Sequence, residues 1–465
     1  MKQILFFISI LLFFSSCSSQ KVEKFDLLIT NASVVDVLGN SIQQYQLIAI
    51  SKDTIRMVDS MENIDKYEGQ EVYDANGKFV MPGLWDNHVH FRGGDSLIQE
   101  NKNLLPLFLA YGITNVRDAG GDITPSVIIW KKQIENKELD GPTILTSGPK
   151  LDGIKPAWPG SIIVDKKEDV QVALDSLEQL NVDYVKMYDG SLTKEMFYEI
   201  IEQAEKRGLK TTGHMPLSAD ILKATDLGLD GTEHMYYVIK SISPLADSLT
   251  LSNPTYGMFS KIVETYNKKL ADSVFKQLAA QNAYITPTLY IGKVLSELTE
   301  VDHQKDSLLN YMGAGIQRTY RGRIESAQRA KAQGNSSRSE LGELAIDLIV
   351  PLYKSGVNIL AGSDSGAFNS FVYPGVSLHS ELRSLVNAGL SPQQALITSM
   401  VNGPKFFDLE ESYGSIAPGK VANLVILDNN PLDDIENLNS INATVIKGTV
   451  YDKVKLNSML KAVKN

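Results

Sequence analysis

Four of the six histidines in this chain stand at positions suited to metal ligation. His88 and His90 form an H-x-H pair, and His214 and His234 follow in the runs TTGHM and GTEH. Side chains two residues apart on a strand point to the same face. His88 and His90 can therefore bind one ion through imidazole nitrogen, the commonest kind of zinc ligand.

Two further residues, Lys186 in DYVKMYDG and Asp364 in AGSDSG, complete the candidate set. An ammonium 4 Å from a dication would cost about 8 kcal/mol at a dielectric constant of about 20. Burial and positive neighbours therefore favour a neutral lysine amine, which can take up carbon dioxide and form a carbamate able to bridge two metal ions. The Asp364 carboxylate can ligate a metal and accept a proton from bound water.

Each of these six residues follows or ends a short apolar run typical of a β-strand. The predicted strands of the central region are Gly83–His90, Thr114–Asp118, Thr143–Ser147, Tyr184–Tyr188, Lys210–His214, Gly231–His234, Tyr284–Leu289 and Val357–Gly362. Amphipathic stretches separate most of them, so the pattern predicts a (β/α)8 barrel with its active site at the C-terminal strand ends. An open doubly wound sheet is the alternative, but no G-x-G-x-x-G follows the first strand.

A lone histidine at a strand end is more often a hydrogen-bonded core residue than a ligand. The strand ends of one barrel converge on one point, however, so six such residues predict a single site. Residues 291–350 form a charged helical insertion between the last two predicted strands, where it can overhang the barrel mouth as a lid.

Short β-runs at both ends of the chain predict a second, smaller domain. Phe25–Ile29 and Ser33–Val37 are two such runs near the start, and Leu424–Leu427 is one near the end. Neither terminal piece can bury a core alone, so we expect them to pack together as a composite β-sandwich. The predicted division is a signal peptide and tether at 1–20, sandwich parts at 24–80 and 406–465, and the barrel at 81–405.

The N-terminus resembles a bacterial lipoprotein signal. The eleven apolar residues Ile4–Phe14 are too few to span a bilayer, which takes roughly 20. Cleavage before Cys17, the only cysteine, would leave a lipidated residue and anchor the protein in the bacterial cell envelope, periplasmic or outer-membrane. Phe14 stands where the signal usually has leucine, and an ordinary secretory signal is the alternative. The net charge of −10 disfavours nucleic-acid binding. The sequence is compatible with a homo-oligomer.

Four residues near the predicted site have weaker claims to substrate binding. Tyr188 shares a strand face with Lys186 and can donate to an oxyanion or a carboxylate, or simply pack. Tyr237 follows His234 in a loop that can line a pocket. Arg117 can clamp a carboxylate, although an internal pair with Asp118 is favoured slightly. The last of the four, His379, is expected to be structural rather than substrate-binding.

The sequence resembles the amidohydrolase superfamily, above all its imidazolonepropionase-like and prolidase-like members, over nearly all of the mature chain. The matching runs are VMPGLWDNHVHF (Val80–Phe91), GITNVRDAGG (Gly112–Gly121), TILTSGPKL, LHSELRSLVNAGLSPQQAL (Leu378–Leu396) and YGSIAPGKVANLVILD (Tyr413–Asp428). The resemblance implies two divalent metal ions, with zinc expected. His88, His90 and Asp364 would bind one ion, and His214 and His234 the other. Carbamylated Lys186 and a hydroxide would bridge them.

The implied reaction is hydrolysis of a C–N amide bond by the bridging hydroxide, with Asp364 as the catalytic proton carrier. A prolidase-like dipeptidase or an N-acyl amino acid hydrolase is the first interpretation, so a small amide or a dipeptide is the expected partner. A single-metal deaminase or cyclic-amide hydrolase is the second, although such relatives often lack the lysine at Lys186. The third is a lipid-anchored binding protein without activity, which would be expected to have lost metal ligands.

Overall fold

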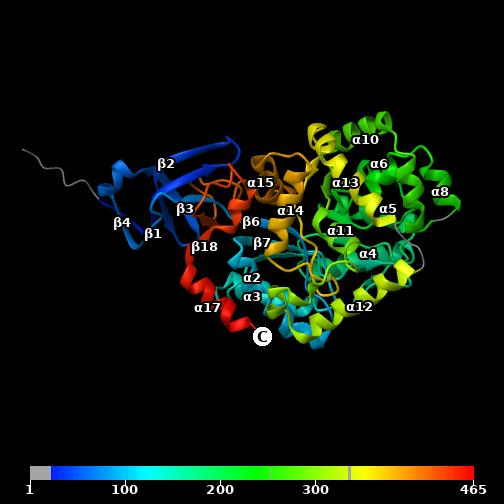
Figure 1. Cartoon of the computed structure of the whole chain (residues 1–465), viewed down its shortest axis with the longest axis horizontal. Coiled ribbons are helices and arrows are strands. Elements are labelled where there is room, and N and C mark those ends of the chain that lie inside the picture. The colour runs from blue at the N-terminus through cyan, green and yellow to red at the C-terminus, as the bar shows by residue number, and fades with distance from the viewer. Residues whose placement is uncertain (1–21, 253, 333–336, 465) are drawn as a thin grey trace, which may run out of the picture.

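The computed structural model describes most of the 465-residue chain (Figure 1). The described residues are 22–252, 254–332 and 337–464. The predicted signal segment and its lipidation site, Cys17, lie outside them. Within the described part of the chain, no helix combines the length and the hydrophobicity needed to cross a bilayer.

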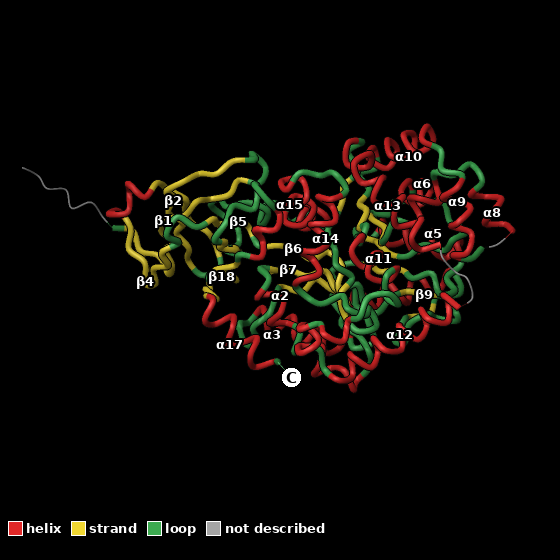
Figure 2. Tube along the Cα trace, in the orientation of Figure 1, coloured by secondary structure: helices red, strands yellow, loops and turns green. Residues whose placement is uncertain are grey.

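The two ends of the chain share one eight-stranded sheet at one end of the molecule (Figure 2). Its strands are β1 (Glu23–Asp36), β2 (Ser41–Ser51), β3 (Thr54–Ser60), β4 (Tyr67–Asp74), β5 (Phe79–Pro82), β17 (Leu424–Leu427), β18 (Ile441–Ile446) and β19 (Thr449–Asp452). The order is β19-β18-β17-β5-β1-β2-β3, with β4 beside β1. The antiparallel pair of β5 with β17 joins the N-terminal strands to the C-terminal ones.

Strand β1 is one continuous element where the sequence predicts two runs, Phe25–Ile29 and Ser33–Val37. The register with β2 shifts between Ile29 and Val34, and Asn31 adopts a left-handed backbone with φ of 51°. A bulge of this kind lets a strand absorb polar residues without ending.

Each of the eight strands predicted for the central region overlaps an observed strand. They are β6 (Leu84–His90), β7 (Ile113–Asp118), β8 (Thr143–Thr146), β11 (Val185–Met187), β12 (Thr211–Gly213), β13 (Gly231–Glu233), β14 (Tyr284–Thr286) and β15 (Asn358–Ile359). Three short strands were not predicted, namely β9 (Leu151–Asp152), β10 (Ile162–Ile163) and β16 (Ser365–Gly366). All of them pair in parallel, as expected for an α/β architecture.

The parallel strands form three separate ladders, ordered β16-β6-β7-β8, β10-β9-β11-β12 and β13-β14-β15. Hydrogen bonds outside the ladders connect each sheet to the next. The amide of Asp183 donates to the Thr146 carbonyl at 2.8 Å, the Thr232 hydroxyl donates to Gly213 at 3.2 Å, and the Asn87 amide donates to Ala361 at 3.0 Å. Among the described residues, the strand pairing thus shows a parallel α/β fold made of three ladders.

Helices surround the parallel strands (Figure 2). They are α1 (Ile98–Lys102), α2 (Leu105–Ala110), α3 (Thr124–Glu135), α4 (Lys167–Gln179), α5 (Lys194–Lys206), α6 (Ile221–Asp226), α7 (Tyr236–Ser241), α8 (Ala246–Ser252), α9 (Phe259–Glu264), α10 (Lys268–Ala280), α11 (Leu289–Ser296), α12 (Ala314–Ala332), α13 (Ser337–Lys354), α14 (Val376–Asn387), α15 (Pro392–Met400), α16 (Asn402–Phe406) and α17 (Lys453–Val463). Helix α5 is typical. The hydroxyl of Thr193 caps its N-terminus, and Phe197, Ile200, Ile201 and Ala204 bury one face.

The predicted insertion at 291–350 contains most of α11, all of α12 and much of α13. Helix α12 packs on the segment that follows Asp364. The Thr319 hydroxyl accepts a hydrogen bond from the Phe368 amide at 2.8 Å, and the Tyr320 carbonyl accepts one from the Ser370 hydroxyl at 3.0 Å. The insertion therefore lies beside one of the predicted metal ligands, and its role as a lid stays a prediction.

Candidate metal centre

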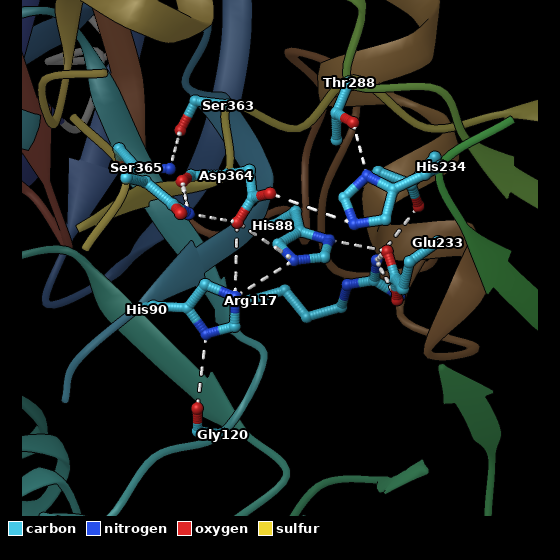
Figure 3. A network of polar contacts seen from close by, with 12 residues as sticks. His88, His90, Arg117, Gly120, Glu233, His234, Thr288, Ser363, Asp364 and Ser365 are labelled. Atoms are coloured by element: carbon cyan, nitrogen blue, oxygen red, sulfur yellow. Dashed lines mark hydrogen bonds and ion pairs between the residues drawn. The ribbon is translucent and has the colours of Figure 1, made fainter. Parts of the chain in front are cut away.

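The structure brings His88, His90 and Asp364 together in a buried cluster (Figure 3). Both histidines lie on β6, and their Nε2 atoms are 3.3 Å apart. Asp364 Oδ1 lies 3.5 Å from His88 Nε2 and 3.2 Å from His90 Nε2. One potential ligand atom from each residue falls within 4.8 Å of the others. Three donors that converge in this way are suited to a divalent cation.

Nδ1 of three histidines lies within hydrogen-bonding distance of an oxygen atom. His88 Nδ1 lies 2.6 Å from Glu233 Oε2, and His90 Nδ1 lies 3.2 Å from the Gly120 carbonyl. His234 Nδ1 lies 2.6 Å from the Thr288 hydroxyl. A carboxylate or a carbonyl accepts a proton from Nδ1, so Nε2 of His88 and of His90 keeps its lone pair for a metal.

His234 and His214 extend the cluster away from β6. His234 Nε2 lies 3.8 Å from Asp364 Oδ2, and the ring centroids of His234 and His214 are 4.8 Å apart. Nδ1 of His214 is buried and has no hydrogen-bond partner within the described chain. Burial lowers the pKa of both rings, that of His234 to about 4. Both imidazoles are therefore neutral near pH 7, the form that binds metal.

Lys186 lies on β11 with its side chain fully buried. Its Nζ is 3.3 Å from Glu233 Oε1, an ion pair without the alignment of a hydrogen bond. Burial lowers the pKa of Lys186 to about 8, although Glu233 acts in the opposite direction. A substantial neutral fraction is therefore present at mildly alkaline pH, and the neutral amine is the nucleophile for carbon dioxide.

Glu233 is the functional residue that the sequence reasoning missed. Its side chain is fully buried. One carboxylate oxygen faces His88 Nδ1, and the other accepts a hydrogen bond from the Thr212 hydroxyl at 2.8 Å. Arg117 Nη2 lies 3.0 Å from both oxygens. The position of Glu233 next to His234 in GTEH was the only sequence signal of its role. That signal is weak, because the partners of Glu233 lie on four other strands.

Two of the residues that form the cluster have left-handed backbones. φ is 62° at His234 and 57° at Asp364. Such backbones are uncommon for residues other than glycine and are held only by surrounding contacts. Ser363, the residue before Asp364, donates from its amide and its hydroxyl to Asp86 at 2.8 and 2.6 Å. The Asn369 amide donates to Asp364 Oδ1 at 2.7 Å.

Comparison with known proteins matches residues 79–451 to a family described as the amidohydrolase family. The chain belongs to the amidohydrolase family. The match spans all six candidate ligands. Amidohydrolases are metal-dependent, and the donors gathered around Asp364 fit that chemistry.

Among curated amidohydrolase relatives, an adenine deaminase of Clostridium acetobutylicum is 22% identical over 401 residues, which are 83% of this chain and 65% of the relative. The chain thus spans about two thirds of that relative's length. A 5-methylthioadenosine/S-adenosylhomocysteine deaminase of Acetivibrio thermocellus is 22% identical over 424 residues, or 87% of this chain and 85% of the relative.

Solved structures share the fold over almost the whole amidohydrolase chain. A bottromycin amidohydrolase has a TM-score of 0.73 at 18% identity and covers 94% of this chain and 90% of its own. A Xaa-Pro dipeptidase with bound methionine in its active site has a TM-score of 0.67 at 17% identity and covers 92% and 99%. Together with the deaminase relatives, these likenesses are consistent with a hydrolase acting on C–N bonds.

The structure places the four weaker candidates in different surroundings. The Tyr188 ring packs on His214 with centroids 4.3 Å apart, so it stands beside the cluster. The Tyr237 hydroxyl lies 3.5 Å from Asp189 instead of pointing to a metal ligand. His379 faces the Tyr111 carbonyl at 2.8 Å and the Asn439 amide at 3.4 Å, contacts that belong to a structural residue.

Arg117 clamps a carboxylate, but that of the internal Glu233, and it does not form the expected pair with Asp118. It is 1% exposed and holds Glu233, so its guanidinium braces the cluster from within the fold. Asp118 instead accepts hydrogen bonds from the Thr146 hydroxyl and the Phe91 amide. Successive residues of β7 point to opposite sides, which keeps Arg117 and Asp118 apart.

Proposed function

We propose that this amidohydrolase hydrolyses a C–N amide bond at a centre of two divalent cations, with zinc as the metal. The observation that carries the proposal is the buried Lys186. Its Nζ lies 3.3 Å from Glu233 Oε1, and the other oxygen of Glu233 lies 2.6 Å from His88 Nδ1. A buried lysine amine whose Nζ has no hydrogen-bond partner among the described residues is suited to carbamylation and metal ligation.

In this proposal His88, His90 and Asp364 hold one cation, and His214 and His234 hold the other. Carbamylated Lys186 is the ligand common to both. When bound, the cations supply Lewis acidity and lower the pKa of water to near neutrality. Asp364 accepts the proton of the attacking water at a carboxylate oxygen and returns it to the leaving nitrogen. We also propose that the three parallel sheets form one closed barrel around this centre.

The proposed substrate is a dipeptide or an N-acyl amino acid. The Xaa-Pro dipeptidase among the fold neighbours supports this class. Deamination of a purine is the second candidate, because the curated relatives above are adenine and methylthioadenosine deaminases. The buried Lys186 argues against a single-metal deaminase, because a lysine at this position would have a function as the ligand shared with a second cation.

Metal content and substrate screening test the proposal together. Purified protein is analysed for zinc and then screened against dipeptides, N-acyl amino acids, lactones, adenine and 5-methylthioadenosine. About two zinc ions per chain, a carbamate mass on Lys186 and amide hydrolysis are expected. One metal ion with unmodified Lys186 and ammonia release from a purine would instead establish the deaminase. Absence of metal would overturn both candidates.

We further propose that the protein is lipid-anchored through Cys17 in a bacterial envelope. The signal-like segment before Cys17 supports this. Incorporation of labelled palmitate into the wild-type protein, and its loss in Cys17→Ser, are the expected results. A labelled Cys17→Ser variant, or an unlabelled wild type, would contradict the anchor.

A further inference from the structure

A second buried lysine, Lys150, lies near the metal centre with no hydrogen-bond partner for its Nζ among the described residues. It stands between β8 and β9 and is 2% exposed. Burial lowers its pKa well below the ordinary lysine value, and the charge of Arg92 lowers it further. A buried cation beside another cation is unfavourable unless an anion compensates both charges.

Aromatic faces surround the two cations. Lys150 Nζ lies 5.1 Å from the ring centroid of Trp158 and 5.4 Å from that of Tyr188. The Arg92 guanidinium lies 4.0 Å from the Trp158 centroid and 5.7 Å from that of Phe368. Arg92 Nε donates to the Ala367 carbonyl at 3.0 Å, which fixes the side chain. Such faces stabilise cations but leave their N–H donors available to an anion.

Both cations are connected directly to the candidate metal ligands. Arg92 follows His90 by two residues along the chain. On the other side, the Tyr188 ring contacts both Lys150 and His214. An anionic group bound by Lys150 and Arg92 would thus lie close to the metal centre.

We propose that Lys150 and Arg92 bind the carboxylate of the substrate, between the faces of Trp158 and Tyr188. The inference rests on the proposed amide hydrolysis and assigns the residues that would recognise the free carboxylate of its proposed substrates, N-acyl amino acids and dipeptides. The carboxylate neutralises both buried cations and accepts their N–H donors. A neutral amide offers neither, so the site selects against it.

Matched substrates test this selection in the zinc-reconstituted full chain. Hydrolysis of a panel of N-acetyl-L-amino acids is compared with that of the corresponding N-acetyl-L-amino acid amides, in which the same bond is cleaved. We expect the wild type to prefer the acids. In Lys150→Met, KM for the acids should rise and the preference should fall by about 30-fold, the usual loss for a charged hydrogen bond.

Two control variants separate binding from folding. Lys155→Met removes the same charge from an exposed position five residues later and should keep the preference. Lys150→Arg retains the cation and should restore part of it. An equal preference in the wild type and in Lys150→Met, or no preference in the wild type, would overturn the proposal while leaving amide hydrolysis in place.

A binding measurement keeps the test independent of turnover. Trp158 contacts both cations, so tryptophan emission of the zinc-loaded protein is recorded by stopped flow with the same acids and amides. A saturable change with the acids alone, lost in Lys150→Met, supports the carboxylate site even if nothing is hydrolysed, in which case only the proposed function fails. The same response to acids and amides, or none to either, would refute the site.

Discussion

Lys186 and Lys150 are two buried lysines near one centre, and their neighbourhoods differ in charge. Lys186 has the Glu233 carboxylate 3.3 Å away, itself held by Arg117. Lys150 has the faces of Trp158 and Tyr188 and the neighbouring cation Arg92. A carboxylate of the fold thus pairs with Lys186, whereas Asp118 and Asp364, which favour the charged form of Lys150, form no hydrogen bond with its Nζ.

The largest expected difference between the two lysines is catalytic. Lys186→Met removes the ligand proposed to join the two cations, so kcat should fall by about 10³-fold, equivalent to about 4 kcal/mol of activation free energy. In Lys150→Met the effect should fall mainly on KM. Steady-state kinetics with the best amide substrate and zinc analysis of each variant measure the contrast. A Lys186→Met enzyme with near wild-type kcat and two zinc ions would abolish it.

Removal of the internal counter-charge is the second test. Glu233→Gln leaves the buried Arg117 without its carboxylate, so the free energy of unfolding should fall by about 3 kcal/mol. Urea denaturation of the metal-free protein measures it. Glu199→Gln is the matched control, because Glu199 pairs with the exposed Lys167 and should change stability by less than about 1 kcal/mol. Equal losses in the two variants would show that Glu233 compensates nothing.

The smallest expected effect is a pH dependence of stability caused by Lys150. Its pKa is lower in the folded protein than in the unfolded chain, so the unfolded chain binds more protons between the two values. The unfolding free energy should therefore rise with pH up to about 10, where unfolded tyrosines begin to ionise.

Metal-free wild type, Lys150→Met and Lys155→Met are compared by urea denaturation between about pH 7.5 and 9.5, a range chosen from the ordinary pKa values. The slope should decrease in Lys150→Met by up to about 1.4 kcal/mol per pH unit and persist in Lys155→Met. Lys186, whose pKa is also lowered, keeps part of the slope in both variants. If the unfolding free energy of the wild type and of Lys150→Met has the same pH dependence, folding does not lower the pKa of Lys150.

The strands and the residues at their ends could be predicted because both depend on local pattern. His88 and His90 follow from the two-residue period of β6, and Asp364 from its place after an apolar run. Glu233 and Lys150 could not be predicted, because their roles depend on neighbours from other strands. The Arg117–Asp118 pair was wrong, since the same two-residue period separates adjacent side chains.

The closure of the predicted barrel also could not be derived from the sequence pattern. Eight βα units were foreseen, but the three parallel sheets are connected by hydrogen bonds outside the ladders, such as those at Asn87, Thr146 and Thr232. Periodicity specifies which residues form strands and says little about contacts of this kind.

The pairing of β5 with β17 sets the order in which the protein can be completed during translation. Strand β5 leads through Gly83 directly into β6, which carries His88 and His90. The edge of β5 that receives β17 has no partner until Leu424–Leu427 has left the ribosome, after the whole α/β region. An unpaired apolar edge invites association with other chains. The eight-stranded sheet can therefore be completed only after the whole α/β region has been synthesised.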